Sequence, residues 1–544
     1  MPMQIPSGEM ELEHMFYAAT ATAATATMTQ PLPGSREPRA GYTYCGEGRG
    51  PDRLPEKRIT QQALDAFFQC AATLFYVMTA EKATQLLERV YHDDNASAQD
   101  LCELCALAAI GSSYKVDEIP GEARAVYFYL ASTGLNEAIE ADAIQGMRIF
   151  ICLCMSSIMD KSSSARLLIV SALNLARGKM EADLQKGGAN ERDTEEDEYR
   201  RTLQTLVFLE GWLSYSLGYR NCLKKSEIDL VHYTIPLTTS PTTASSSALT
   251  TRLIQSHMTK LTLLASGSQD EIAAHGATYW SHADTLSSRL NTWHHNLPPD
   301  LHLDALTRDD GKRSVTILQE RALYLMHILY IDMRLQLHCQ LIKASYVSHR
   351  GPEADENFIE RLFAQVPSQT LDAHMTFAVQ LAGIVSLLFR ETATMTRCWL
   401  VIRSVFDACI VLLFSACRRY ASSPSEQIDS MGDIFTHVDT CLTVLTFCSR
   451  RDIVAHRLFE ALDSVFRDLS RLTDTEMNNP PGQGGSNLNA SGGGTQGSLS
   501  TSREMCIQYI VDDACAEQVP RRKALVGVMV RLLDLMSPGG NFWV

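Results

Sequence analysis

Two closely spaced cysteines, Cys102 and Cys105, form a C-x-x-C pattern, which in zinc sites supplies half of the ligand set. A structural zinc site needs four nitrogen or sulfur ligands, usually as two such pairs, and no second pair lies near in the sequence. The neighbouring residues Leu101, Leu104 and Leu107 are apolar. We therefore expect both thiols to lie in the core, on a buried helix.

Two further patterns suggest metal chemistry without completing it. Asp93-Asp94 is similar to the aspartate-rich motif of all-α isoprenoid synthases, but one helical turn later the sequence has Ser97 and Ala98 instead of further carboxylates. We expect a loop or a helix start there. His294-His295 are adjacent, so on a helix their side chains diverge by about 100°. The sequence thus predicts no catalytic, cofactor-binding or metal-binding residue.

The elements that carry these residues are expected to be helices. Apolar residues recur at steps of three and four along one face in the ranges 64–75, 286–297, 315–329 and 458–472. Alternating apolar and polar patterns of useful length are nearly absent. The sequence therefore predicts an all-α fold, an irregular multi-helix bundle or array without a substantial sheet.

Changes in composition divide the chain. Proline-rich and Ala/Thr-rich sequence at the start predicts disorder, and a stretch rich in Gly, Asn and Ser near the end predicts a flexible linker. A Ser/Thr-rich run at 238–251 is expected to separate two helical lobes. The predicted segments are a disordered leader (1–59), a helical regulatory domain (60–470) with loops near 185–199 and 236–250, a flexible linker (471–502), and a C-terminal helix with a tail (503–544).

Charge and cysteine content exclude several classes of protein. The 544 residues include 63 acidic and 48 basic ones, a net charge of −15, so a whole-chain nucleic-acid clamp is excluded. The 15 scattered cysteines are typical of reduced thiols inside a cell. The first 17 residues carry Glu9, Glu11 and Glu13 but no Lys or Arg, so we expect no signal peptide. The apolar stretches fall short of the ~18 residues of a membrane span, so we expect no membrane partner.

One stretch combines a basic start, an apolar helix with aromatic residues, and a Gly-Tyr-Arg turn followed by Ser-Glu-Ile-Asp. It comprises Arg200–Leu213, Gly218–Arg220 and Ser226–Asp229. Three later segments follow in order: Leu286–Pro299, Leu325–Tyr330 and Cys398–Leu413. Together these segments resemble the fungal-specific transcription factor domain, the middle regulatory region of fungal binuclear zinc cluster regulators. The resemblance covers roughly residues 60–470.

The resemblance implies a nuclear transcription regulator, not an enzyme, that controls a metabolic or secondary-metabolite pathway. Its partners would be other transcription regulators or coactivators, and a homodimer or a small-molecule effector is left open. In physical terms, the large side chains of Trp212, Trp293 and Trp399 are expected to be packing anchors between helices. Gly218 is expected to end a helix in the left-handed conformation.

The sequence departs from the family at the zinc module, in which six closely spaced cysteines bind two zinc ions. Before residue 60 the only cysteine is Cys45. We therefore expect no cofactor in this chain; zinc would be bound only if an N-terminal cluster exists outside it. We expect the chain to reach promoter DNA only indirectly or through a missing module. DNA-binding residues stay unknown. Two alternatives remain open: an all-α enzyme of the isoprenoid synthase type, and a helical scaffold without a role in transcription.

Overall fold

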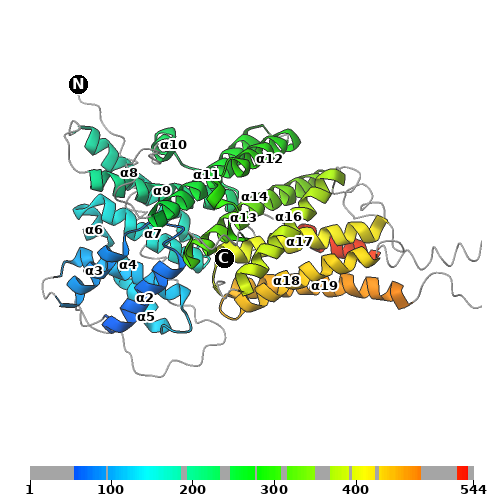
Figure 1. Cartoon of the computed structure of the whole chain (residues 1–544), viewed down its shortest axis with the longest axis horizontal. Coiled ribbons are helices and arrows are strands. Elements are labelled where there is room, and N and C mark those ends of the chain that lie inside the picture. The colour runs from blue at the N-terminus through cyan, green and yellow to red at the C-terminus, as the bar shows by residue number, and fades with distance from the viewer. Residues whose placement is uncertain are drawn as a thin grey trace, which may run out of the picture. The chain divides into compact units, whose positions relative to one another are not determined.

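The computed structural model describes residues 54–92, 96–185, 193–232, 246–275, 279–307, 315–349, 368–390, 395–422, 428–478 and 523–536. Helices make up 86% of this described part, and no strand occurs in it (Figure 1). The prediction of an all-α multi-helix array is therefore confirmed.

Contacts divide the chain into two compact units. The first unit runs to Glu271 and adds Pro298–Leu323, whereas the second combines Ile272–Leu297 with Tyr324–Phe542. Two boundaries between the units fall within long helices, α11 (Ser246–His275) and α14 (Ile317–His349), and a third lies at residues 297/298, just before Pro298-Pro299. None of these boundaries lies at the Ser/Thr-rich run 238–251.

The first unit is built around α4 (Ala98–Tyr114), in which every residue from Cys102 to Ser113 is buried. A helix that is apolar on all sides must be surrounded by other helices, and α4 packs against α2, α5 and α7. At the crossing with α2, a Cβ on Gly111 would lie 1.9 Å from the carbonyl oxygen of Ala63, so only glycine fits there. The other helices of this unit are α2 (Lys57–Cys70), α3 (Ala80–His92), α5 (Gly121–Thr133), α6 (Leu135–Ala141), α7 (Ala143–Met159), α8 (Ser164–Gln185), α9 (Asp193–Leu217), α10 (Lys225–His232), η2 (Pro299–Leu301) and α13 (Asp304–Thr307).

The second unit is built around α17 (Trp399–Ser422), which is buried without interruption from Ser404 to Cys417. It packs against α16 (Ser368–Arg390), α18 (Ile428–Ser449) and α19 (Ile453–Asn478). Helix α12 (Tyr279–His295) and a last helix over residues 523–535 also belong to this unit.

Two helices in the described part are long and apolar enough to cross a membrane. They are Asp372–Arg390, with mean hydropathy 1.4, and Trp399–Ala421, with mean hydropathy 2.1. The most apolar window of Trp399–Ala421 is 94% buried inside the protein, against 33% for Asp372–Arg390. Two such helices are weak evidence for a membrane, because a buried core helix has the same length and composition.

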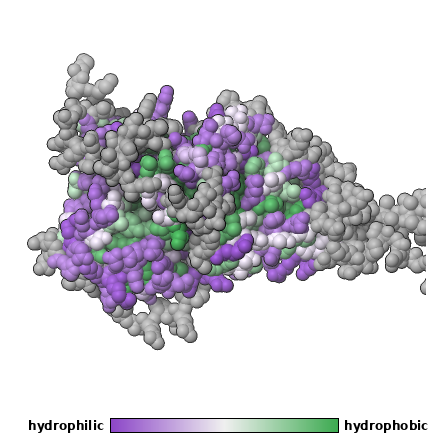
Figure 2. All heavy atoms as spheres, viewed as in Figure 1, coloured by the Kyte–Doolittle hydropathy of each residue, from purple (hydrophilic) through white to green (hydrophobic). Residues whose placement is uncertain are grey.

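The visible face of the molecule mixes hydrophilic residues with hydrophobic residues that lie between them (Figure 2). The large apolar side chains that are exposed in the described residues lie on different helices: Tyr129, Leu249, Ile317, Leu387 and Ile453. Scattered single residues of this kind are normal for a protein surface.

Several sequence predictions of helix ends and packing are confirmed. Helix α12 stops at His295, shortly before Pro298-Pro299. Gly218 follows α9 with φ 70°, the left-handed conformation expected of a helix cap. Trp212, Trp293 and Trp399 are buried, as anchors between helices should be.

Three predicted loop or linker segments are wrong in part. The loop expected near 185–199 is helical from Asp193, the loop expected near 236–250 is helical from Ser246, and the linker expected at 471–502 is helical up to Asn478. Acidic side chains are favourable in the first turn of a helix, so an acidic run also suits a helix start. The helical part begins at Lys57, slightly before residue 60. The rest of the predicted leader and linker lies outside the described residues.

Candidate functional site

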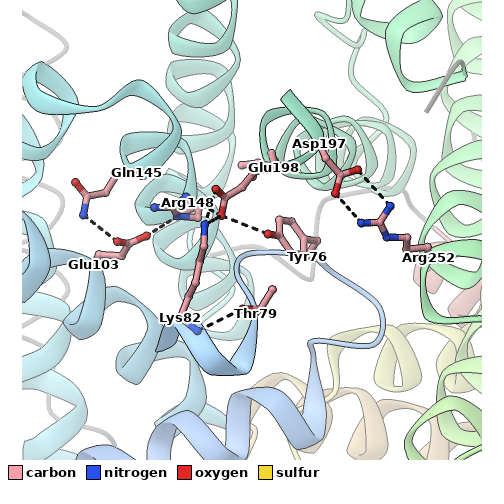
Figure 3. Close-up of polar contacts among 10 residues, drawn as sticks. Tyr76, Thr79, Lys82, Glu103, Gln145, Arg148, Asp197, Glu198 and Arg252 are labelled. Carbon is pink, nitrogen blue, oxygen red and sulfur yellow. Dashed lines mark hydrogen bonds and ion pairs between the residues drawn. The ribbon is translucent and has the colours of Figure 1, made fainter. Parts of the chain in front are cut away.

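Helix α9 carries the clearest part of the family resemblance, and polar groups of the first unit gather at both of its ends. Near its start, Glu198 accepts hydrogen bonds from Nζ of Lys82 on α3 at 2.6 and 2.7 Å (Figure 3). The hydroxyl of Tyr76 lies 3.4 Å from Oε1 of the same carboxylate, and Nη1 of Arg148 on α7 lies 3.5 Å from it. Three side chains from separate parts of the chain therefore converge on Glu198.

Arg148 extends this cluster to α4. Its Nε donates to Oε1 of Glu103 at 2.5 Å, and Gln145 donates to the other oxygen of Glu103 at 2.8 Å (Figure 3). Burial acts to lower the pKa of Arg148, but Glu103 and Glu198 outweigh it, so the pKa is raised and the guanidinium stays charged. Two carboxylates thus share one arginine and one lysine, which leaves the cluster close to neutral.

A second arginine and a second ion pair fix the same end of α9. The Cζ atom of Arg201 lies 3.6 Å from the centre of the Tyr76 ring, a cation–π contact. Burial raises the pKa of Tyr76 to about 12, so its hydroxyl keeps its proton. On α11, Arg252 pairs with both oxygens of Asp197, at 2.6 and 3.2 Å (Figure 3). The start of α9 is therefore bound to α3, α7, α11 and the segment after α2.

The other end of α9 is organised by a buried carboxylate, Glu210. The left-handed turn at Gly218 brings Tyr219 back to it, and the Tyr219 hydroxyl donates to Glu210 Oε2 at 3.1 Å. The backbone N–H of Cys222 donates to Oε1 at 2.9 Å. Burial raises the pKa of Glu210, while these hydrogen bonds act in the opposite direction.

The connection that follows is held by Arg177 of α8. Its Nε and Nη2 lie 2.6 and 3.2 Å from the two oxygens of Glu227 on α10, and Nη2 also donates to the carbonyl oxygen of Cys222 at 2.8 Å. Glu227 additionally accepts the backbone N–H of Lys224 at 2.8 Å. Glu210 and Arg177 together fix the chain between α9 and α10.

A third polar cluster lies in the core of the second unit. Asp332 on α14 accepts a hydrogen bond from Gln336 at 2.8 Å, and Asp407 on α17 accepts one from Nε of Arg403 at 2.8 Å. Both carboxylates are buried. Burial and the charge of Asp407 raise the pKa of Asp332. Two acids that face one arginine in a dry core are expected to retain one proton between them.

These three clusters are built to fix helices. Their carboxylates accept hydrogen bonds from arginine, lysine, tyrosine, glutamine or backbone N–H groups inside the protein, and these bonds join separate elements or successive turns of one helix. Sequence reasoning predicted no pairing for any of these charged residues. A charged residue within an apolar stretch of sequence, such as Glu210 between Leu209 and Trp212, was the one pattern that could have indicated a buried polar contact.

The residues that the sequence singled out do not come together in one site. Cys102 and Cys105 are buried on α4, as predicted, and Cys102 donates to the carbonyl oxygen of Ala131 at 3.0 Å. Burial raises the pKa of Cys102 to about 12, so this thiol stays protonated in its buried position. Asp93-Asp94 lie outside the described residues. His294 lies in the last turn of α12, and its ring stacks on that of Tyr330 with 4.7 Å between the ring centres.

The described residues contain no group of three or more His, Cys, Asp or Glu side chains that could hold a metal ion. Comparison of the chain with protein-family models, with curated proteins and with solved structures finds no match. The resemblance to the fungal-specific transcription factor domain therefore depends on the sequence segments alone and stays a prediction.

Proposed function

We propose that this chain is a transcription regulator of the fungal zinc-cluster type that acts in the nucleus on a metabolic or secondary-metabolite pathway. In this proposal its helical units bind other regulators or coactivators, it performs no catalysis, and promoter DNA is reached through another module or another protein.

One observation supports the proposal most. Glu210, Gly218 and Glu227 all belong to the sequence stretch that carries the resemblance, and the same three residues hold the connection between α9 and α10. A family pattern is expected to preserve residues on which the shape of a domain depends. The agreement between the pattern and the buried contacts favours a related helical domain over a chance similarity in composition.

The experiment that tests this function tethers the full chain to a promoter. A heterologous DNA-binding domain is fused to the chain in a fungal strain that carries a matching reporter gene. We expect reporter expression to change relative to the DNA-binding domain alone. A fusion in which Arg177→Ala loosens the α9–α10 connection should lose this effect, whereas Arg200→Ala, at an exposed ion pair of α9, should keep it. A fusion that is nuclear and abundant but leaves the reporter unchanged would contradict the proposal.

A mobility-shift assay of the isolated chain tests the part of the proposal that concerns DNA. We expect no sequence-specific complex at physiological salt, because the chain is acidic overall. A tight, salt-resistant complex with one DNA sequence would show that the chain contacts promoters by itself.

A further inference from the structure

Arg334 of α14 is a buried cation of the second unit that contacts both α12 and α16 (Figure 1). The residue is 7% exposed. Its Nη1 donates hydrogen bonds to the hydroxyl of Tyr330, at 2.9 Å, and to Oδ1 of Asn291, and its Nη2 donates to Oγ of Ser287 at 2.8 Å. All three acceptors are neutral oxygen atoms.

Within the described part of the chain, no carboxylate pairs with the charge of Arg334. Its other contacts are to aromatic rings: the Cζ atom lies 4.1 Å from the centre of the Phe377 ring on α16 and 5.7 Å from that of Tyr330. Aromatic faces attract a cation but do not neutralise it. A buried charge without a counter-charge is unfavourable, so this position has a strong preference for an anion.

Two N–H groups of this guanidinium have no acceptor among the described residues. A guanidinium carries five N–H donors, one on Nε and two on each Nη atom. The Nε atom of Arg334 is buried and unpaired there. The hydrogen bonds to neutral oxygens use one of the two donors on Nη2, so the other is also unpaired. Buried polar groups are nearly always hydrogen-bonded, so these donors give Arg334 the capacity to bind further acceptors.

Three other arginines with largely buried side chains have the acidic partner that Arg334 lacks. Their side chains are 11, 14 and 16% exposed, in the order in which the pairs follow. The pairs are Arg148 with Glu103, Arg177 with Glu227, and Arg403 with Asp407. The fold thus compensates buried guanidinium groups elsewhere, and Arg334 departs from that pattern.

The acidic side chains nearest in sequence do not supply the charge. Asp332 lies two positions before Arg334 on α14, so it points to another side of the helix, where it interacts with a carboxylate of α17. Asp284 on α12 is exposed and makes no ion pair with Arg334 in the described structure. One turn after Arg334, α14 presents His338, whose ring stacks on that of His374 of α16 with 4.0 Å between centres. These surroundings favour an anion over a cation.

The guanidinium is accessible to a ligand at α12. Asn291 is exposed and Ser287 is half-buried, and the two residues share one side of α12 because they are four positions apart. An exposed asparagine side chain can rotate into solvent at little cost, because water replaces its hydrogen bond. An anion that takes its place meets Nη1 and Nη2, and two oxygen atoms of a carboxylate or phosphate match this planar fork.

We propose that Arg334, Asn291 and Ser287 form a binding site for a small-molecule anion, whose carboxylate or phosphate group pairs with the guanidinium. The anion displaces the side chain of Asn291. The hydroxyl of Ser287 accepts a hydrogen bond from Nη2 and keeps its own proton to donate to the anion. Binding neutralises the buried charge and joins α12 to α14. The inference concerns binding alone and does not depend on the role in transcription.

Isothermal titration calorimetry of the full chain tests the site with sodium phosphate and sodium benzoate. The controls are sodium chloride at equal ionic strength and benzamide, which has nearly the shape of benzoate but no charge. We expect phosphate or benzoate to bind saturably and neither control to bind in the same concentration range. Tighter binding of phosphate indicates a phosphorylated ligand, and tighter binding of benzoate an organic acid. Hydrogen exchange should slow over residues 283–295 when the anion is bound.

Variants at the two ends of the contact locate the anion. Asn291→Asp places a carboxylate of the chain itself beside Arg334, so it should raise the unfolding temperature by about 2–4 °C and weaken anion binding about tenfold or more. Asn291→Ala removes the same amide without adding charge, so it should keep anion binding. Arg334→Met should weaken binding roughly 30-fold or more. Arg471→Met, at a side chain of α19 that is 77% exposed, should leave binding unchanged.

Two results would overturn the proposal. The first is binding of phosphate and benzoate that is no tighter than that of chloride and benzamide, because the buried charge would then select no anion. The second is an Asn291→Asp variant that neither gains stability nor loses anion binding, because the anion would then bind elsewhere. Asn291 is exposed, so this variant decides the question even if Arg334→Met does not fold.

Discussion

Replacement of Arg177 by alanine tests how the connection between α9 and α10 is held. In the structure, this guanidinium makes two contacts to Glu227, at 2.6 and 3.2 Å, and a third to the carbonyl oxygen of Cys222 at 2.8 Å. The side chain of Glu227 is 2% exposed. Arg177→Ala therefore leaves a buried carboxylate without its cation.

The expected cost follows from the burial of the pair. Removal of one partner from a buried ion pair costs about 3–5 kcal/mol, because the remaining charge is not solvated. Arg177 itself is 14% exposed, and Glu227 keeps the N–H of Lys224, so the lower end of this range applies. We expect a loss of about 3 kcal/mol in the local stability of α10.

Hydrogen exchange measured by mass spectrometry on the range 218–232 reports this local stability. A loss of about 3 kcal/mol corresponds to roughly 100-fold faster exchange. The matched control is Arg200→Ala, which removes the same side chain from an exposed i,i+4 pair with Glu196 on α9. Exposed helix pairs contribute about 0.3–0.5 kcal/mol, so the control should barely change the exchange.

A double variant separates pairing from packing. Arg177→Met with Glu227→Leu removes both charges and keeps apolar volume, so it should be more stable than Arg177→Ala alone. The reasoning is refuted if Arg177→Ala accelerates exchange no more than Arg200→Ala does, since the buried pair would then contribute nothing beyond a surface pair.

Two further predictions concern the first unit. Gly111→Ala should destabilise it by about 3 kcal/mol in thermal unfolding, because the new Cβ would lie 1.9 Å from the backbone oxygen of Ala63. The control is Gly178→Ala on α8, where a Cβ would meet nothing within 4 Å; this change should stabilise the unit by about 0.5–1 kcal/mol. Similar effects at both sites would contradict the close approach of α2 and α4. In the folded protein, burial and the charge of Lys260 lower the pKa of His257 to about 4. In the unfolded chain the pKa is about 6.5, so the unfolded state takes up the proton first as the pH falls. The free energy of unfolding therefore decreases below about pH 6.5. Between pH 7 and pH 5 this histidine should account for a loss of about 2 kcal/mol in the free energy of unfolding, measured by urea titration. His257→Gln should remove that part of the pH dependence. If the variant loses as much stability between pH 7 and pH 5 as the original protein, the prediction is wrong.

Local sequence was sufficient to predict the helices and several of their ends. The stripe that ends at Leu297, the stop before Pro298-Pro299 and the left-handed cap at Gly218 all appear as expected. Each depends on residues within one or two turns of one another, because helical hydrogen bonds link residues four positions apart. The burial of Trp212 follows from the same periodicity.

The acidic run before α9 shows where local sequence failed. Its composition suggested a solvated loop, yet the helix begins at Asp193, and Glu198 pairs with Lys82 and Arg148. These partners lie 116 and 50 positions away in the sequence. No local sequence pattern predicts which distant basic residue will pair with a given acidic residue.

The sequence by itself determined that this protein is helical, where most helices run, and which apolar faces they bury. Only the tertiary structure decided that Glu210 accepts a hydrogen bond from Tyr219 and that the buried carboxylates of Asp332 and Asp407 interact. It also decided that Arg531 pairs with Asp468. The division into two units within α11 and α14 was also decided at that level. The physical reason is that helix formation is governed by neighbours in the chain, whereas the energy of a charge depends on its burial and on partners that only the folded chain brings near.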